Sequence, residues 1–248
     1  MSDSMTVTAS DLGALTQQYQ SITHNLANAN TVGYKRQISN FRGVMNEMAG
    51  DNDPTPGSRH IGHTVRNDIQ MDFTQGVMES TGRSLDVAIH GEGAFFVVET
   101  AQGPLYSRNG AFYLSPEGKL VDAGGRQIAG ENGPLIAPNK VSDTQIQVGR
   151  DGTLSAEGQS FGKIKLVQIE DLTQLKPAGS GCFRLPASIR PKPADKASLE
   201  QGNLEKSNVD AVEELVKLIQ VSRLYEAGVK TISAQDERLG QLMRVAQG

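Results

Sequence analysis

The chain has 248 residues and a net charge of −4, and 37% of its residues are apolar but only 5% are aromatic, with no tryptophan. This length can bury a sizeable core, but the shortage of large aromatic side chains indicates a core that is spread out rather than concentrated around an enzyme pocket. Lysine and arginine are scattered without a basic run, so nucleic acid and anionic membranes are not expected as partners. The single cysteine, Cys182, excludes an internal disulfide and any paired-cysteine redox or zinc motif.

The first residues contain no basic segment followed by an apolar run, so we expect no cleaved secretory signal. No window reaches the roughly 20 apolar residues of a membrane-spanning helix, so membrane insertion is not expected either. We therefore expect a protein that is either cytoplasmic or exported without a cleaved signal peptide.

An apolar stripe near the N-terminus predicts an amphipathic helix. Its members are spaced by three and four residues: Leu12, Leu15, Tyr19, Ile22 and Leu26. This is the spacing of a coiled-coil seam. A helical hairpin that packs onto a sheet would show the same periodicity, so that alternative stays open.

The stripe ends in a segment rich in asparagine, which runs from Asn25 through Asn28 and Asn30 to Gly33. Asparagine is a weak helix former because its amide competes for backbone hydrogen bonds, and it tolerates left-handed conformations. Glycine adopts a positive φ without steric cost. We therefore predict that the helix unwinds here and that Gly33 has a positive φ.

Residues 48–60 are rich in turn formers and predict a linker. From about Ser84, short apolar runs alternate with turn sequences, which favours an antiparallel meander or barrel. The run 94–98 is apolar on both faces and is predicted to be a buried strand, whereas 177–193 is predicted to be irregular. The expected strands lie at 85–89, 94–98, 105–108, 111–114, 119–121, 127–129, 144–148 and 163–169.

The C-terminal segment predicts a second and longer helix. Ser207 to Asp210 fits a capping box, and acidic residues follow in the first turn. From residue 208 to about 245 this helix would be about 55 Å long, so it should project or pack against a partner. With the neighbouring Ile219, its stripe comprises Leu215, Leu218, Ser222, Tyr225, Val229, Ile232, Asp236, Leu239 and Met243.

Two members of this stripe, Ser222 and Asp236, are polar. Occasional polar seam residues set register and partner number in coiled coils. Their presence argues against a simple buried core and favours packing with several neighbours.

The sequence predicts no catalytic residue, no cofactor and no metal site. His60 and His63 lie in or beside the linker without a third ligand nearby. Gly91 and Gly93 follow a strand, but the third glycine and the helix of a phosphate-binding loop are missing, so a tight hairpin is the better interpretation. Only a pocket could unite the nearest acid–base set, which is Asp86, His90 and Glu92.

Four motifs occur in order over nearly the whole chain. They are Asn28–Lys35, preceded by Asn25-Leu26-Ala27; Leu85–Gly93, continued by Ala94-Phe95-Phe96; Tyr106–Phe112 with Gly118–Val121; and Gly202–Val209 with Arg223 and Tyr225-Glu226. Together they resemble the bacterial flagellar basal-body rod and hook protein family, specifically the rod proteins of the proximal and distal segments. The chain departs from the family pattern in having Val32 where proline is usual and Ala94 before the paired phenylalanines.

The resemblance implies a structural subunit and not an enzyme. Such subunits polymerise into the periplasmic drive shaft that transmits torque from motor to hook. The implied partners are copies of itself, other rod and hook subunits and the flagellar type III export apparatus, with no small-molecule substrate. The central region has no obvious long insertion, which favours the proximal rod slightly over the distal rod.

The resemblance also gives roles to residues. The two helical stripes would form an intersubunit core, and the motif residues at the ends of the helices would form the junctions. These junction residues are Asn25, Asn28, Asn30, Gly33, Tyr34, Gly202, Ser207, Asn208 and Val209.

The predicted fold class is α+β, with N- and C-terminal α-helices that form a coiled-coil-like helical core and a central antiparallel β-rich domain. The expected domains are 1–47, with the first helix and the asparagine-rich turn; 48–75, a linker; 76–200, the β domain; and 203–248, the long helix. A different class also stays open, namely a β-rich exported enzyme or carbohydrate-binding protein that oligomerises through its terminal helices.

Overall fold

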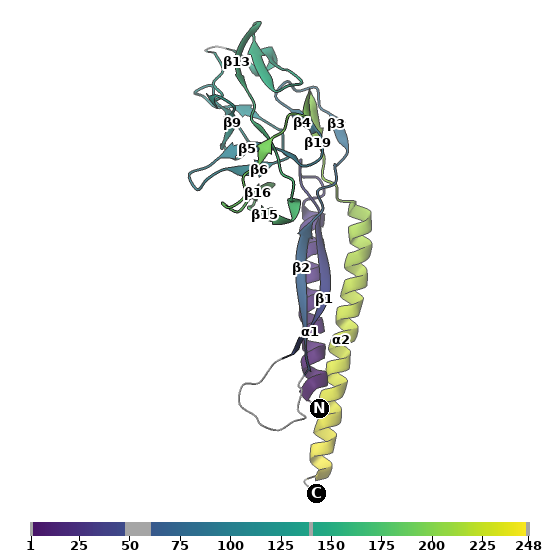
Figure 1. Ribbon diagram of the computed structural model, residues 1–248. Coiled ribbons are helices and arrows are strands. Elements are labelled where there is room, and N and C mark those ends of the chain that lie inside the picture. Colours follow the sequence, from purple (N-terminus) through teal and green to yellow (C-terminus); the bar gives the residue numbers. More distant parts are fainter. Residues whose placement is uncertain (1, 48–60, 139–140, 247–248) are drawn as a thin grey trace. The chain divides into compact units, whose positions relative to one another are not determined.

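The computed structural model describes residues 2–47, 61–138 and 141–246. Two compact units make up the chain (Figure 1). The helix–ribbon unit comprises Met1–Ala27, Gln37–Gln70 and Asp210–Gly248, and the β unit comprises Asn28–Arg36 and Met71–Val209. The domain boundaries expected from the sequence stay a prediction.

The helix–ribbon unit consists of two α-helices and a two-stranded ribbon. Helix α1 spans Ser2–Ala27 and helix α2 spans Ala211–Ala246. Strand β1, Gln37–Glu47, is hydrogen-bonded to strand β2, Ile61–Met71. Helix α1 contacts both α2 and β1, and Figure 1 shows the ribbon and α2 running alongside it.

The predicted coiled-coil-like helical core is wrong. The described residues contain two α-helices and a large β-rich body, and a coiled coil within the chain would bury each helical stripe against the other. Leu215, Ile219 and Val229 instead remain 45%, 54% and 41% exposed. Helix α1 also packs against β1, so part of its surface serves the ribbon and not a second helix.

Helix α2 begins with a cap that differs from the predicted one. The Asp210 Oδ1 atom accepts hydrogen bonds from the backbone N–H groups of Val212 and Glu213, at 2.9 and 3.1 Å. The Ser207 hydroxyl accepts from the N–H of Val209 instead. Aspartate and serine are both favourable N-cap residues. The sequence therefore indicated where the helix starts but not which of the two residues caps its N-terminus.

The β unit is built from short strands. They are β3 (Met78–Ser80), β4 (Val87–His90), β5 (Ala94–Glu99), β6 (Leu105–Ser107), β7 (Tyr113–Leu114), β8 (Leu120–Val121), β9 (Gln127–Gly130), β10 (Gly133–Pro134), β11 (Ile146–Val148), β12 (Thr153–Ala156), β13 (Gln159–Lys163), β14 (Leu166–Gln168), β15 (Lys176–Pro177), β16 (Cys182–Arg184), β17 (Lys192–Pro193), β18 (Ser198–Gln201) and β19 (Asn203–Glu205). Short 3₁₀ turns precede β11 and β15, at Asp143–Gln145 and Leu172–Gln174.

The largest sheet has the order β15-β16-β6-β5-β9-β8-β7, with β14 joining β5 to β17 and β10 pairing with β9. Three smaller sheets are formed by β11-β12-β13, by β18 with β4 and by β19 with β3. The strand pairs are antiparallel, as predicted for the middle of the chain.

The stretch 177–193 is not irregular throughout, which corrects the prediction. Strand β16 pairs with β6, and β17 pairs with β14, so this stretch extends the largest sheet. Strands of two or three residues are too short to show an alternating pattern in the sequence.

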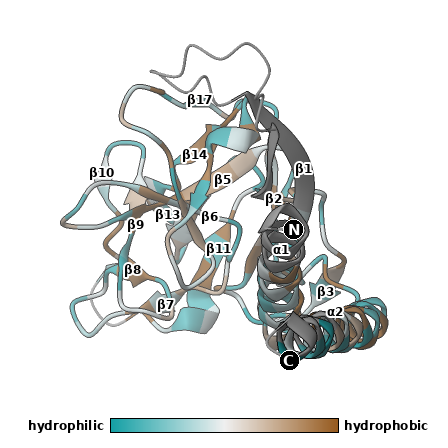
Figure 2. Cartoon of the chain, turned by 90° about the horizontal axis from the view of Figure 1, so that it is seen from below, coloured by the Kyte–Doolittle hydropathy of each residue, from teal (hydrophilic) through white to brown (hydrophobic). Residues whose placement is uncertain are grey.

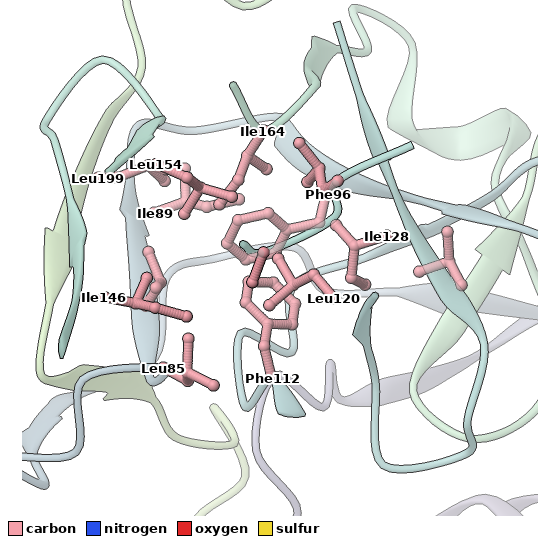
Figure 3. Packing of buried hydrophobic residues seen from close by; sticks show 14 of the residues in the cluster. Leu85, Ile89, Phe96, Phe112, Leu120, Ile128, Ile146, Leu154, Ile164 and Leu199 are labelled. Atoms are coloured by element: carbon pink, nitrogen blue, oxygen red, sulfur yellow. The ribbon is translucent and has the colours of Figure 1, made fainter. Parts of the chain in front are cut away.

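Strand β5 separates two hydrophobic clusters. Phe96 and Val98 belong to one cluster and Phe95 and Val97 to the other, so both faces of the strand are buried as predicted. In the first cluster Phe96 meets Phe112 edge to face, with ring centroids 4.9 Å apart and aliphatic side chains around them (Figure 3). Hydrophobic stretches lie around β5 and β14 in the middle of the β unit, whereas much of its loop backbone is hydrophilic (Figure 2).

Gly33 lies in the β unit after the end of α1. Its φ is 68°, which confirms the predicted positive value. Its N–H donates to the backbone carbonyl of Glu205 at 2.8 Å. A Cβ atom at Gly33 would lie 2.5 Å from the backbone nitrogen of Asn109, so the Arg108–Asn109 backbone leaves no room for a side chain.

We predict that Gly33→Ala destabilises the protein much more than Gly82→Ala. Both glycines have a φ of 68°, so both substitutions carry the left-handed cost of about 1–2 kcal/mol. Gly82 has open space where its Cβ would lie, whereas Gly33→Ala adds a backbone clash worth at least about 2 kcal/mol. Urea unfolding followed by near-UV circular dichroism measures both, and equal losses would contradict the steric explanation.

Candidate assembly surface and its junctions

The predicted stripe residues of α1 and α2 differ widely in burial. Ile22 is buried, and the exposed members are Tyr19, Leu215, Ile219, Tyr225 and Val229. Those with intermediate burial are Leu12, Leu15, Leu26, Leu218, Ser222 and Ile232. The side chains of Asp236, Leu239 and Met243 lie outside the described ones. Much of the stripe therefore faces outward, and its role in assembly stays a prediction.

A groove runs between α1 and α2 beside the exposed stripe residues. It measures about 240 Å³ and is lined by Leu15, Thr16, Tyr19, Val221, Ser222 and Tyr225. Val221 is only 3% exposed, while Tyr19 and Tyr225 are 44% and 42% exposed. The lining is apolar and aromatic, with four hydroxyl groups and no charge among the described residues, which is a composition suited to contact with another protein surface.

Asn25 ties three elements of the helix–ribbon unit together. Its Nδ2 group donates to the Gln37 carbonyl at 2.8 Å and to Glu214 Oε2 at 3.1 Å, and its Oδ1 atom accepts from the Gln37 N–H at 2.8 Å. Asn25 and Glu214 are almost fully buried. Lys217 completes the arrangement with its ammonium 2.9 Å from Glu214 Oε1. One amide thus joins α1, β1 and α2.

Asn208 plays a similar part in the β unit. Its Oδ1 atom accepts from the Arg36 N–H at 2.8 Å, and its Nδ2 group donates to the Asp72 carbonyl at 2.8 Å and to Thr74 Oγ1 at 3.0 Å. The Arg36 guanidinium also pairs with the Asp72 carboxylate at 3.0 Å. Burial raises the pKa of Asp72, but hydrogen bonds from Thr74 and Arg36 outweigh it, so its pKa lies below the usual value.

The remaining junction residues hold turns. Thr31 closes the turn after α1 by bonding both the carbonyl and the side chain of Asn28. Gly202 has a φ of 79°, and its N–H donates to the Asp86 carbonyl at 2.7 Å. Tyr34 and Ser207 are buried, Val209 is half-buried and Asn30 is exposed.

The β unit contains a buried cluster of three charged residues, Lys35, Arg108 and Glu205, which lie in or next to the junction motifs. The Glu205 carboxylate is 2.5 Å from Lys35 Nζ and 2.9 Å from Arg108 Nε, and it also accepts from the Gly76 N–H at 3.0 Å. Lys35, Arg108 and Glu205 are 1%, 3% and 1% exposed. Lys35 donates further to the Thr74 carbonyl, and Arg108 to the carbonyls of Ala94 and Gly91.

Burial lowers the pKa of both Lys35 and Arg108, and the nearby Glu205 carboxylate opposes that shift. Sequence reasoning did not single out these three residues, although each lies inside one of the quoted motifs. For Lys35 and Arg108 the available signal was a single charged residue in an otherwise uncharged motif, which points to a buried partner rather than to solvent. The motif of Glu205 also contains Lys206 and gives no such signal.

The candidate acid–base set does not converge. Asp86 bonds to Thr81 and Arg83, and His90 lies 2.5 Å from Glu200. Gly91 and Gly93 form a turn, but it leads from β4 to β5 in a different sheet and is not a hairpin. Strand β4 pairs instead with β18.

Among the described residues, no three His, Cys, Asp or Glu side chains are grouped as a metal site would require. His60 lies outside the described residues, as does the side chain of His63. Within the same part of the chain, neither helix has an apolar stretch long enough to cross a membrane.

We predict that Glu205→Gln destabilises the protein more than Lys35→Met. The cluster holds two cations and one carboxylate, so Glu205→Gln leaves two buried cations together, while Lys35→Met leaves a balanced Arg108–Glu205 pair. Loss of the carboxylate should cost about 3–5 kcal/mol. Chemical unfolding at neutral pH compares the two variants, and a larger loss for Lys35→Met would contradict this charge balance.

Comparisons with known proteins match most of the length of the chain. The protein-family model described as "Flagellar basal body rod FlgEFG protein C-terminal" matches residues 200–245. A second family model, described as "Flagellar hook protein FlgE/F/G D1 domain", matches residues 88–156. The first of these ranges includes the Gly202–Val209 motif and most of α2, and the second runs from β4 to β12.

Full-length relatives agree with these matches. The chain is 33% identical to the flagellar basal-body rod protein FlgF of Caulobacter vibrioides over 241 residues, which is 92% of this chain and 94% of that protein. It is 32% identical to the rod protein FlgG of Bacillus subtilis, over 90% and 91% of the two chains. It is 31% identical to FlgF of Salmonella typhimurium, over 94% of each. The chain therefore belongs to the family of flagellar basal-body rod proteins, which are structural subunits of the flagellum and not enzymes.

Proposed function

We propose that this protein is a subunit of the proximal rod, and that it assembles with copies of itself and with other rod and hook subunits through exposed apolar residues of α1 and α2. In this role it forms part of the periplasmic drive shaft that carries torque from motor to hook. Delivery by the flagellar type III export apparatus belongs to the same proposal. The only cysteine, Cys182, is buried and free, so the fold needs no oxidation step after export.

The observation that carries the proposal is the exposure of large apolar side chains along α2. Val212, Leu215, Val216, Ile219 and Leu224 are each between 45% and 71% exposed. A group of this kind on one helix marks an interaction surface, because full burial of a large apolar side chain is worth about 1.5–3 kcal/mol and these partly exposed side chains forgo a large part of it. Packing against neighbouring subunits would recover that free energy.

The assignment to the proximal segment rests on the middle of the chain. In its described residues, 71–138 and 141–209, the β unit has short strands and short connections without a long insertion between them. Relatives named FlgF and FlgG match at similar identity, so the choice between proximal and distal segments depends on an experiment in the cell.

We predict that Ile219→Asp blocks rod assembly and leaves the β unit folded. The carboxylate would have to lose its hydration in an apolar contact, while the β core lies in other residues. Gln220→Asp is the matched control, because it adds the same charge to the adjacent exposed position. Electron microscopy of basal bodies reports assembly and near-UV circular dichroism reports the fold. Leu15→Asp should act like Ile219→Asp, and normal rods in both variants would contradict the assembly role.

We also predict that deletion of the gene leaves a rod stub shorter than the stub left by deletion of a distal-rod gene in the same bacterium. A proximal subunit is needed before distal ones can be added, so its loss ends the structure earlier. Images of purified basal bodies give the two lengths. Equal stubs would place the protein in the distal segment, and an intact rod and hook would refute the rod role.

A further inference from the structure

The helix–ribbon unit carries a convex apolar feature as well as the concave one. The α2 ridge consists of Val212, Leu215, Val216 and Ile219, which are 71%, 45%, 50% and 54% exposed. The tyrosine groove is the groove between α1 and α2 already described, with Tyr19 and Tyr225 among its lining residues.

The ridge is a stripe of its own. Its members follow the spacing i, i+3, i+4 and i+7, which places them on one side of a helix. At 3.6 residues per turn, their centre lies about 160° around α2 from Glu214 and Val221, the buried residues of that helix. The ridge therefore points away from α1, whereas the groove includes Val221 and opens beside α1.

A subunit cannot fill its own groove with its own ridge. Asn25 bonds to Glu214, while a Cβ atom at Gly228 would lie 3.3 Å from Leu12 Cδ1, so the two helices run antiparallel. Along α2, Val216 is nine residues before Tyr225, or about 14 Å. Ridge and groove thus lie at different levels of the helix as well as on different sides.

The two surfaces match in chemistry. None of the described residues that line the groove is charged, and the four members of the ridge are aliphatic. Contact between the ridge and the groove would not remove any charged side chain of either surface from water. The hydroxyl groups of the tyrosines could stay in water at the edge of the contact. A partner with a charged surface would fit neither feature.

We propose that the α2 ridge of one subunit packs into the tyrosine groove of a second copy. This inference rests on the proposed role in rod assembly and specifies its contact. Because each subunit offers a ridge to one neighbour and a groove to another, the contact is heterologous and does not close, so it adds subunits in one direction. Such polarity is what a growing shaft requires.

The test uses engineered disulfides in assembled basal bodies. Val216→Cys on the ridge is combined with Thr16→Cys in the groove, and the native Cys182 contributes little background because it is 2% exposed. A disulfide forms only when the two Cα atoms come within about 7 Å. After mild oxidation we expect cross-linked dimers and larger species from the double variant on a non-reducing gel, and monomers from each single variant.

Glu213→Cys with Thr16→Cys is the matched control, since Glu213 is exposed on the same turn but off the ridge; this pair should cross-link far less. Dimers from Val216→Cys alone would indicate a ridge-to-ridge contact and would overturn the proposal. Normal rods without cross-links in the double variant would overturn it too, while leaving the rod function intact. Absence of the wild-type protein from purified basal bodies would instead refute the proposed function. If the Val216→Cys and Thr16→Cys double variant does not assemble into rods, the double variant Leu215→Cys and Ser222→Cys replaces it, and the same gel outcomes support or overturn the proposal.

Discussion

A carboxylate removed from water needs cations and hydrogen-bond donors around it, and Glu205 obtains them from separate parts of the chain. Lys35 comes from the segment after α1, Arg108 from the loop after β6, and Gly76 from the start of the β unit. The backbone of Glu205 also accepts from Gly33, where only glycine fits. These contacts make the segments near both ends of the chain integral parts of the β unit, so its core cannot be completed by residues 76–200 alone.

The two units satisfy their apolar residues in different ways. The β unit buries both faces of β5 in its two hydrophobic clusters. The helix–ribbon unit is held by the buried Asn25–Glu214 contact and a small apolar region around Ile22 and Val221. Several large apolar side chains of α2, among them Leu215, Val216 and Ile219, stay exposed. A closed β core and an open helical surface fit the proposed assembly role, because the β unit buries its apolar residues internally whereas the helix–ribbon unit leaves apolar residues exposed.

The sequence allowed prediction of those elements whose pattern is local. Helical periodicity located both helices, and apolar runs between turn residues located β5, β6 and β9. The ribbon of β1 and β2 was missed, because β1 lacks a regular alternation and both strands are stabilised by pairing with each other and by contact of β1 with α1. The cap of α2 was assigned to Ser207 and not Asp210, because two good capping residues stand close together. The coiled-coil core was wrong because periodicity reports an apolar face but not what covers it.

The candidate site shows the same limit. Asn25, Gly33 and Asn208 could be singled out because asparagine and glycine have particular backbone preferences at the ends of helices. Their actual partners, Gln37 and Glu214 for Asn25 and Asp72 and Thr74 for Asn208, are distant in sequence and follow no local rule.

The sequence by itself thus determined the two helices, several strands of the β unit, the positive φ of Gly33 and, through four motifs, the family. Only the tertiary structure decided that Lys35, Arg108 and Glu205 meet in one buried cluster and that Leu215 and Ile219 face outward. Charge pairing and burial depend on which distant segments come together, and a pattern of spacing along the chain does not contain that information.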